Sequence, residues 1–438
     1  MTPITLAAVF SMYKFWAKRF IFKLNSTPYI KSLVPKVFWF KMLAILTFTL
    51  IHELIYGGDT INYTKRGGGV IYRAFGDDPL TALQVIFLPD YNNFKHLSII
   101  NQMVFDYNQR EALIIKICAI CSLLTFDSYL SIDIILSTFA LSGLWAIYLI
   151  FNKLHPNLNK KFAFAFFYIP SLTFWSAGVL KEPLAIGAMG WMFYSLYGVF
   201  FNKSKSPYTY LLLILSFLIL KEIKIYIILC FMPALIFWLF IQKTKTIKNL
   251  IVRKVFTPLF FISGILGAFY AANIVTQGDK QYDISKIAET SKATSEYLLY
   301  LGKTQNASAY DLGSQDGTFG GMLRLAGPAI NVALFRPYPW ESRNITMFVS
   351  SLESLFFLFL TLKILIKVGI IKTFSIIAET PLVLFCFVFS VAFAFAVGIS
   401  SYNFGTLVRY KIPFLPFYLS GLYIMEGFIS KKYKKKIL

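Results

Sequence analysis

The feature that most constrains this chain is a series of apolar runs, most of them close to the ~20 residues that a helix needs to cross a membrane. Of its 438 residues, 57% are hydrophobic and only 15% are charged, a profile typical of a polytopic membrane protein. We therefore predict an all-α membrane bundle of about ten transmembrane helices. The candidate spans are residues 37–56, 130–152, 161–180, 183–201, 207–221, 223–242, 255–275, 344–366, 380–399 and 411–429.

The charge of the chain agrees with a membrane protein once its position along the sequence is considered. The 43 Lys and Arg residues against 21 Asp and Glu residues give a net charge of +22, which in a soluble protein would indicate nucleic-acid binding. If the N-terminus is inside and the short apolar run 112–125 lies along the surface, every inner segment is basic, as the positive-inside rule requires. We therefore expect no nucleic acid partner and cytoplasmic N- and C-termini.

This topology divides the chain into a membrane domain and two terminal segments. Residues 1–36 form a cytoplasmic, amphipathic segment at the membrane interface, and residues 430–438 form a basic cytoplasmic tail. The transmembrane domain, 37–429, has long outer loops at about 57–129 and 276–343. The first loop holds short amphipathic stretches that could lie along the outer interface, and the second holds a predicted helix followed by a flexible Gly/Ser/Asp-rich piece.

Two acidic positions follow predicted spans on the outer side. Asp59 lies just past the first span, after two glycines that let the backbone turn. Lys181 and Glu182, followed by a proline, form the next outer corner. Both have a plain structural interpretation as well, Asp59 as a cap of a turn and the Lys181-Glu182 pair as a hydrophilic hairpin tip.

Basic residues on the outer side run against the positive-inside trend and therefore need a reason. Arg336 and Glu341 lie in "ALFRPYPWESRN", where the second long loop re-enters the membrane, and Arg409 and Lys411 precede the last span. Arginine binds phosphate through a planar fork and lysine as a point charge, so an anionic lipid-phosphate substrate is one reason and simple headgroup contact is another. The three histidines are scattered and do not indicate a metal site.

The layout and a few short motifs resemble a known family. The layout consists of an inside N-terminus, Asp59 after the first span, a long first outer loop with interfacial helices, and Glu182 in the next outer corner after Pro170 and Ser176. The C-terminal "RYKIPFLPF" is similar to the Arg-Tyr-x-x-Pro entry into a late span. In these features the chain resembles GT-C class membrane glycosyltransferases that use polyprenyl-phosphate sugars, in particular the protein-mannosyltransferase-like branch, and related polysaccharide polymerases.

The resemblance implies transfer of a sugar or oligosaccharide from a polyprenyl-phosphate- or diphosphate-linked donor to a hydroxyl of a glycan, lipid or protein acceptor on the outer face. It implies Asp59 as the catalytic base and Glu182 as a supporting acid. The expected phosphate-binding residues are Arg336, Arg409, Lys411 and Lys181, with Glu341 and Tyr63 in support. No cofactor is expected, and a divalent metal is left open.

We expect an integral protein of the bacterial inner membrane, in contact with membrane lipids and active in cell-envelope polysaccharide or glycoconjugate synthesis. One alternative is a polymerase of O-antigen or exopolysaccharide repeat units, in which the cations would grip two lipid-linked chains. A second alternative is a transporter or flippase of lipid-linked sugars, which would need polar residues at mid-span and broken helices. The predicted spans are apolar through their middles, which disfavours the transporter.

Overall fold

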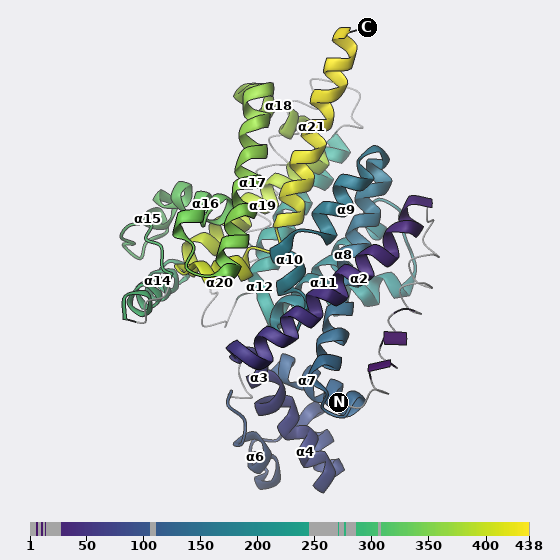
Figure 1. The fold of residues 1–438 in the computed structure, drawn as a ribbon, viewed down its shortest axis with the longest axis vertical. Coiled ribbons are helices and arrows are strands. Elements are labelled where there is room, and N and C mark those ends of the chain that lie inside the picture. The colour runs from purple at the N-terminus through teal and green to yellow at the C-terminus, as the bar shows by residue number, and fades with distance from the viewer. Residues whose placement is uncertain are drawn as a thin grey trace. The chain divides into compact units, whose positions relative to one another are not determined.

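The regular structure of the described chain is helical (Figure 1). The computed structural model describes residues 28–105, 111–244, 286–304 and 308–437, with a few isolated residues outside these ranges. Within these ranges the only β-structure is an isolated bridge between Ala309 and Asn403. The predicted all-α class is therefore confirmed for the described part of the chain.

The helices follow one another along the chain, with η marking a π- or 3-10 turn. Up to residue 175 they are α2 (Pro28–Ile51), η1 (His52–Tyr56), α3 (Asp59–Tyr63), η2 (Thr64–Gly68), α4 (Gly69–Asp77), α5 (Pro79–Phe87), α6 (Phe94–Ile100), α7 (Ala112–Thr125), α8 (Tyr129–Leu154), η3 (Pro156–Leu158), α9 (Asn159–Phe167) and α10 (Pro170–Trp175). After residue 175 they are α11 (Lys181–Phe200), α12 (Pro207–Thr244), α14 (Ile287–Thr304), α15 (Phe319–Arg324), α16 (Ala326–Phe335), η4 (Pro339–Glu341), α17 (Ile345–Val368), α18 (Ile370–Glu379), α19 (Pro381–Ser401), α20 (Phe404–Tyr410) and α21 (Leu415–Ile437).

The chain forms two compact units. Unit 1 comprises Met1–Ile147, Thr173–Val199 and Lys203–Lys224. Unit 2 comprises Tyr148–Leu172, Phe200–Asn202 and Ile225–Leu438. The long helices α8 and α12 contribute residues to both units, and the backbone of α12 leaves helical conformation at Lys224, where unit 1 ends (φ −150°, ψ 72°).

Six of the described helices are long and apolar enough to cross a membrane, which supports a membrane protein but not the ten predicted spans. They cover Pro28–Ile55, Tyr129–Leu154, Lys181–Phe200, Pro207–Gln242, Ile345–Val368 and Pro381–Ser401. Four of them coincide closely with the predicted spans 130–152, 183–201, 344–366 and 380–399, and the first contains nearly all of the predicted span 37–56. The first helix begins at Pro28 and therefore takes in part of the predicted interfacial segment 1–36, the rest of which lies almost entirely outside the described residues.

The predicted span 161–180 is broken into pieces. Helix α9 ends at Phe167, α10 occupies only Pro170–Trp175, and the residues from Ser176 to Leu180 are not helical. Pro170 cannot continue the α9 hydrogen-bond ladder. Gly178 lies so close to Phe48 of α2 that an added Cβ would come within 1.9 Å of the ring. The run is apolar as predicted, but it forms the end of α9, the short α10 and a non-helical segment instead of one span.

The predicted spans 207–221 and 223–242 both lie in α12, which consists of two helical stretches that meet at Lys224. The sequence contains neither Gly nor Pro from Tyr208 to Met232, so no residue stops the helix at Lys221 and Glu222, where a hairpin was expected. The chain stays helical through both residues and departs only at Lys224. The predicted boundary between two helical stretches is therefore present, but it lies at Lys224 and not at Lys221 and Glu222.

The other predictions for the membrane domain have mixed outcomes. The run 112–125 is helix α7, shorter than a span as expected. Helix α21 covers most of the predicted span 411–429, but it carries Glu426 and a lysine-rich end and is not among the six span-length apolar helices. The predicted span 255–275 lies outside the described residues, apart from Tyr270.

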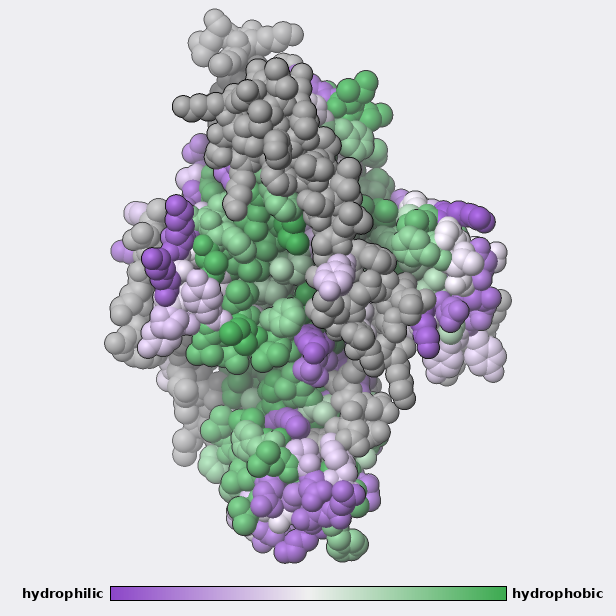
Figure 2. Space-filling view, turned by 180° about the vertical axis from the view of Figure 1, so that it is seen from behind, coloured by the Kyte–Doolittle hydropathy of each residue, from purple (hydrophilic) through white to green (hydrophobic). Residues whose placement is uncertain are grey.

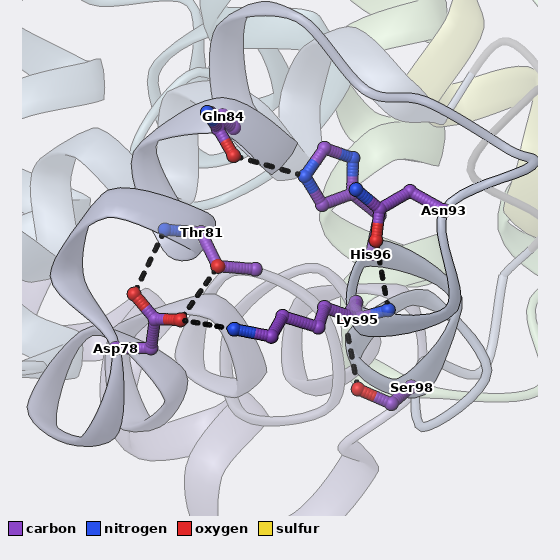
Figure 3. A network of polar contacts seen from close by, with 7 residues as sticks. All are labelled: Asp78, Thr81, Gln84, Asn93, Lys95, His96 and Ser98. Atoms are coloured by element: carbon purple, nitrogen blue, oxygen red, sulfur yellow. Dashed lines mark hydrogen bonds and ion pairs between the residues drawn. The ribbon is translucent and has the colours of Figure 1, made fainter.

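The first predicted outer loop is largely helical, from α3 to α7. Asp78 caps α5, because its carboxylate accepts hydrogen bonds from the Thr81 amide (3.2 Å) and hydroxyl (2.7 Å), and these bonds hold the pKa of Asp78 below its ordinary value (Figure 3). Lys95 of α6 lies 3.7 Å from the same carboxylate, and His96 is 3.2 Å from Gln84 of α5. In Figure 2 hydrophilic side chains gather over the region of α4 and α6, beside apolar ones.

The second predicted outer loop is helical at α14, as expected, and extended after Ser308. The Gly/Ser/Asp-rich piece that was expected to be flexible contains three buried side chains, those of Tyr310, Leu312 and Gln315. Tyr310 stacks on Tyr402 with ring centroids 5.6 Å apart, and the Gln315 amide donates to the Tyr402 hydroxyl (2.9 Å). These contacts attach this piece to the end of α19.

Candidate functional site

Asp59 lies on a short, tightly constrained helical segment. The helix α2 ends in the π-helical turn η1, and Gly57 and Gly58 then take positive φ angles of 55° and 69° before Asp59 begins α3. A second π-helical turn, η2, follows at Thr64. π-helical turns are rare and concentrate at functional sites. Asp59 itself is half-buried, so its carboxylate lies at a surface and not in a core.

The glycines after Asp59 fix this segment on α7. An added Cβ at Gly68 would lie 2.5 Å from the Ala119 amide nitrogen, so only glycine allows the backbone of η2 to approach α7 this closely. On the inner side of α3, Tyr63 is buried and packs on Phe105, with ring centroids 5.3 Å apart. Tyr63 thus supports the backbone that carries Asp59.

Lys181 and Glu182 begin α11, and each has an ion-pair partner from a distant element. Lys181 Nζ is 2.7 Å from Glu111 Oε1, and the two side chains are 13% and 20% exposed. Lys224 Nζ is 2.7 Å from Glu182 Oε1, and these two side chains are only 6% and 1% exposed. Glu182 is therefore a buried acid in the first turn of α11, not a group on an exposed hairpin tip.

A buried lysine holds the chain just before this pair. Lys41 lies in the middle of the first candidate span, and its ammonium donates three hydrogen bonds, to Thr173 O (3.0 Å), Ser176 O (2.8 Å) and Ser176 Oγ (2.7 Å). The carbonyls at the end of a helix have no intrahelical partner. Lys41 therefore satisfies the end of α10 where the helix breaks, and no carboxylate lies within ion-pair distance of it among the described residues.

A buried aspartate holds the other side of the break. Asp133 of α8 accepts a hydrogen bond from the Val179 amide (2.7 Å) and one from the Thr49 hydroxyl (2.5 Å) of α2. Within the non-helical residues 176–180, a cation thus binds Ser176 and a carboxylate binds the Val179 amide. We call Lys41, Asp133 and residues 176–180 the break clamp.

The sequence interpretation missed both charged members of the break clamp. Each is a single charge within an apolar run, in "FWFKMLAIL" and "SIDIIL". Charged residues inside membrane spans are rare and usually have a specific partner. That rule could have drawn attention to Lys41 and Asp133, although it could not have named their backbone partners.

In unit 2, Arg336 is held by Glu341, five residues later. Arg336 Nε is 3.1 Å from each Glu341 oxygen, Nη2 also contacts Oε1, and the Tyr338 amide donates to Oε2 (2.7 Å). The guanidinium lies over the ring of Phe404 at 5.2 Å. The two charged side chains remain about one fifth exposed, at 22% and 18%.

Lys411 is buried beneath this corner. Its ammonium donates to the Arg336 carbonyl (3.2 Å) and the Ser354 hydroxyl (2.9 Å), and Ser354 in turn donates to the Arg336 carbonyl (3.1 Å). Arg409, near the end of α20, is only half-buried and lies 5.7 Å from the ring of Tyr410. Lys411 therefore binds the backbone of the protein itself, whereas the Arg409 side chain is partly exposed at the surface.

The predicted site residues thus fall into two groups. Unit 1 holds Asp59, Tyr63, Lys181 and Glu182, and unit 2 holds Arg336, Glu341, Arg409 and Lys411. Within unit 2, hydrogen bonds connect Arg336 with both Glu341 and Lys411. In the described ranges, no three His, Cys, Asp or Glu side chains come together in a way that could hold a metal ion.

No protein-family model matches this chain, and no curated protein or solved structure is significantly similar to it. Its function has to be inferred from its own residues and their contacts.

Proposed function

We propose that the protein is an integral membrane glycosyltransferase that transfers a sugar or oligosaccharide from a polyprenyl-phosphate or diphosphate carrier to an acceptor hydroxyl. The observation that carries the proposal is Asp59, a half-buried carboxylate at the end of a candidate span, set on backbone that two π-helical turns and two positive-φ glycines constrain. A general base needs such a fixed position within reach of the proton it removes.

In the proposed reaction, Asp59 removes the proton of the acceptor hydroxyl as its oxygen attacks the anomeric carbon of the donor. The new C–O bond forms as the bond between that carbon and the carrier phosphate breaks, so a single displacement inverts the configuration. The electron pair leaves with the phosphate, whose added negative charge needs cations nearby.

Within unit 2, taken by itself, two arginines have donors suited to a phosphate oxygen. Arg409 is half-buried at the end of α20, and Arg336 uses Nε and Nη2 for Glu341, which leaves Nη1 to donate to a phosphate oxygen. Lys411 acts through Arg336 as a positioning residue, since it binds the Arg336 carbonyl. Glu182 is likewise a positioning residue, in unit 1, because its side chain is buried and forms an ion pair with Lys224.

The test is transfer activity of membranes or purified protein with a panel of polyprenyl-phosphate and diphosphate sugars. We expect Asp59→Asn to lower the transfer rate by about 100-fold or more, within the range that general bases contribute. Asp77→Asn, at an exposed carboxylate at the end of α4 in the same predicted outer loop, is the matched control and should keep its activity. Full activity of Asp59→Asn at normal expression would refute the assignment, and a ladder of lengthening products would identify a polymerase.

A second candidate function is transport of a lipid-linked sugar across the membrane. The transporter would lie in a bacterial inner membrane, with the N- and C-termini of the protein in the cytoplasm. The break clamp favours it, because it places a lysine at mid-span beside an interrupted helix, a combination found at substrate sites of transporters. In proteoliposomes a transporter would move labelled lipid-linked sugar between leaflets and form no transfer product. Asp59→Asn should leave that movement unchanged.

A further inference from the structure

Helix α18 is a short helix between two candidate membrane spans. It begins after Gly369, whose φ of 84° ends α17, and the next span, α19, begins at Pro381. It contacts both neighbours, and Figure 1 draws it beside the end of α17. With ten residues it is too short to cross a membrane, so its place relative to the lipid depends on which of its faces are covered.

The residues of α18 divide into three sectors around the helix, given ~100° of rotation per residue. Thr373 is buried and, with the half-buried Ile376 and Ile377, forms the side that packs on the protein. An apolar sector of about 100° is exposed, as is a polar sector beside it. The apolar sector holds Ile370, Ile371, Phe374 and Ala378, and the polar sector holds Lys372, Ser375 and Glu379.

The apolar sector is highly exposed for side chains of this size. Ile370 and Phe374 are 64% exposed and Ile371 is 89% exposed. Ile366, at the end of α17, is 80% exposed and continues the row of exposed apolar residues along one face of that span. This row consists of Ile345, Phe348, Val349, Leu352, Phe356, Phe359, Leu362 and Ile366. Since α17 is a candidate span, lipid is the natural cover for its row and for the apolar sector that continues it.

Basic residues surround α18. Lys367 at the end of α17 and Lys372 in the polar sector are both exposed. Nearby on α17, Lys363 shares Glu426 with Lys161 of α9, at 2.5 and 2.7 Å, so three helices meet in a cluster of two cations and one anion. The end of unit 2 that includes α18 is therefore positively charged.

We propose that α18 lies in the plane of the membrane interface, with its apolar sector among the acyl chains and with Lys367 and Lys372 bound to anionic lipid headgroups. Amphipathic helices bind the interface through buried apolar area together with attraction to anionic lipids. Basic residues next to a span recognise acidic headgroups in the same way. The proposal is independent of the transferase reaction.

The experiment places a fluorophore on α18 of the full-length protein in lipid nanodiscs and quenches it with brominated lipids. Phe374→Cys places the label in the apolar sector, and Lys372→Cys places it in the polar sector. We expect strong quenching at position 374 and weak quenching at position 372. The unsubstituted protein has three buried cysteines, Cys118, Cys121 and Cys386, and a half-buried one, Cys230, and it controls for background labelling.

The second arm tests headgroup recognition with Phe374→Cys as the labelled parent. Brominated phosphatidylglycerol should quench more than brominated phosphatidylcholine at equal content. Adding Lys367→Gln and Lys372→Gln should lower this preference by about fivefold for each lysine. Equal quenching at 374 and 372, or none at either position, would refute the interfacial placement, and an unchanged lipid preference in the glutamine variants would refute headgroup binding.

Discussion

Two charged regions, one in each unit, are held in different ways. In unit 1, residues 176–182 are held by side chains from distant parts of the chain: Lys41 lies 132 to 135 positions from the carbonyls it binds, and Lys224 lies 42 positions from Glu182. In unit 2, the Arg336–Glu341 pair joins residues only five positions apart, whereas other contacts of that unit, such as Lys161 with Glu426, are long-range. A local corner of this kind can form on its own, whereas the unit 1 contacts require the packed bundle.

The ion pairs of the two regions also differ in exposure to solvent. This difference predicts which pair contributes more to the free energy of unfolding. The Glu182–Lys224 pair is almost fully buried, and the Arg336–Glu341 pair is about one fifth exposed. Removing one partner of a buried pair leaves an uncompensated charge, which is more costly than losing a pair that water can reach. Breaking the Glu182–Lys224 pair should therefore have a larger effect on stability than breaking the Arg336–Glu341 pair.

The largest effect is expected for Lys224→Met. It leaves the Glu182 carboxylate buried without its ammonium partner and should lower the free energy of unfolding by about 3–5 kcal/mol. The measurement is denaturant unfolding of the purified protein in mixed micelles. Adding Glu182→Gln should restore part of the loss, because the double variant has no buried charge at this position. Equal losses in the single and double variants would contradict the importance of this pair.

The next effect is expected for Lys41→Met, a change that keeps much of the side-chain volume and removes the three hydrogen bonds of the break clamp. Each buried acceptor left without a partner costs about 1–3 kcal/mol. Hydrogen exchange should also become faster in residues 173–180. Leu43→Met, two positions away on an exposed side of α2, is the control and should change neither measurement. Unchanged exchange in Lys41→Met would show that the break does not depend on this lysine.

The fold could be predicted from the sequence where one apolar run forms one helix. The spans at 130–152 and 344–366 are continuous runs, and the structure has α8 and α17 there. The run 161–180 has the same composition, yet Pro170 and the contact of Gly178 with Phe48 break it. Composition measures whether a segment prefers lipid, but the direction of its backbone depends on neighbours far away in the sequence.

The candidate site was predictable to a similar extent. The sequence pointed to Lys181 and Glu182 as unusual, because charges in apolar runs are rare. Their partners, Glu111 and Lys224, could not be deduced, since one sequence does not say which spans are neighbours. The same limit explains Lys411, which was expected to bind phosphate and is instead buried against the Arg336 carbonyl.

The smallest effect is expected for Glu341→Gln in unit 2. The substitution keeps an oxygen that can accept from Arg336 or from the Tyr338 amide, and water can reach the guanidinium, so the loss in unfolding free energy should be about 1 kcal/mol or less. Glu379→Gln, at an exposed acid that accepts from Ser375, is the control for removing one negative charge from unit 2. If Glu341→Gln lowered the free energy of unfolding as much as Lys224→Met, the Arg336–Glu341 pair would contribute as much to stability as the buried Glu182–Lys224 pair. A small loss of unfolding free energy would indicate that Lys411 and Ser354 are the main contacts that position Arg336. These two residues bind the Arg336 carbonyl, so the guanidinium can turn toward an anionic ligand.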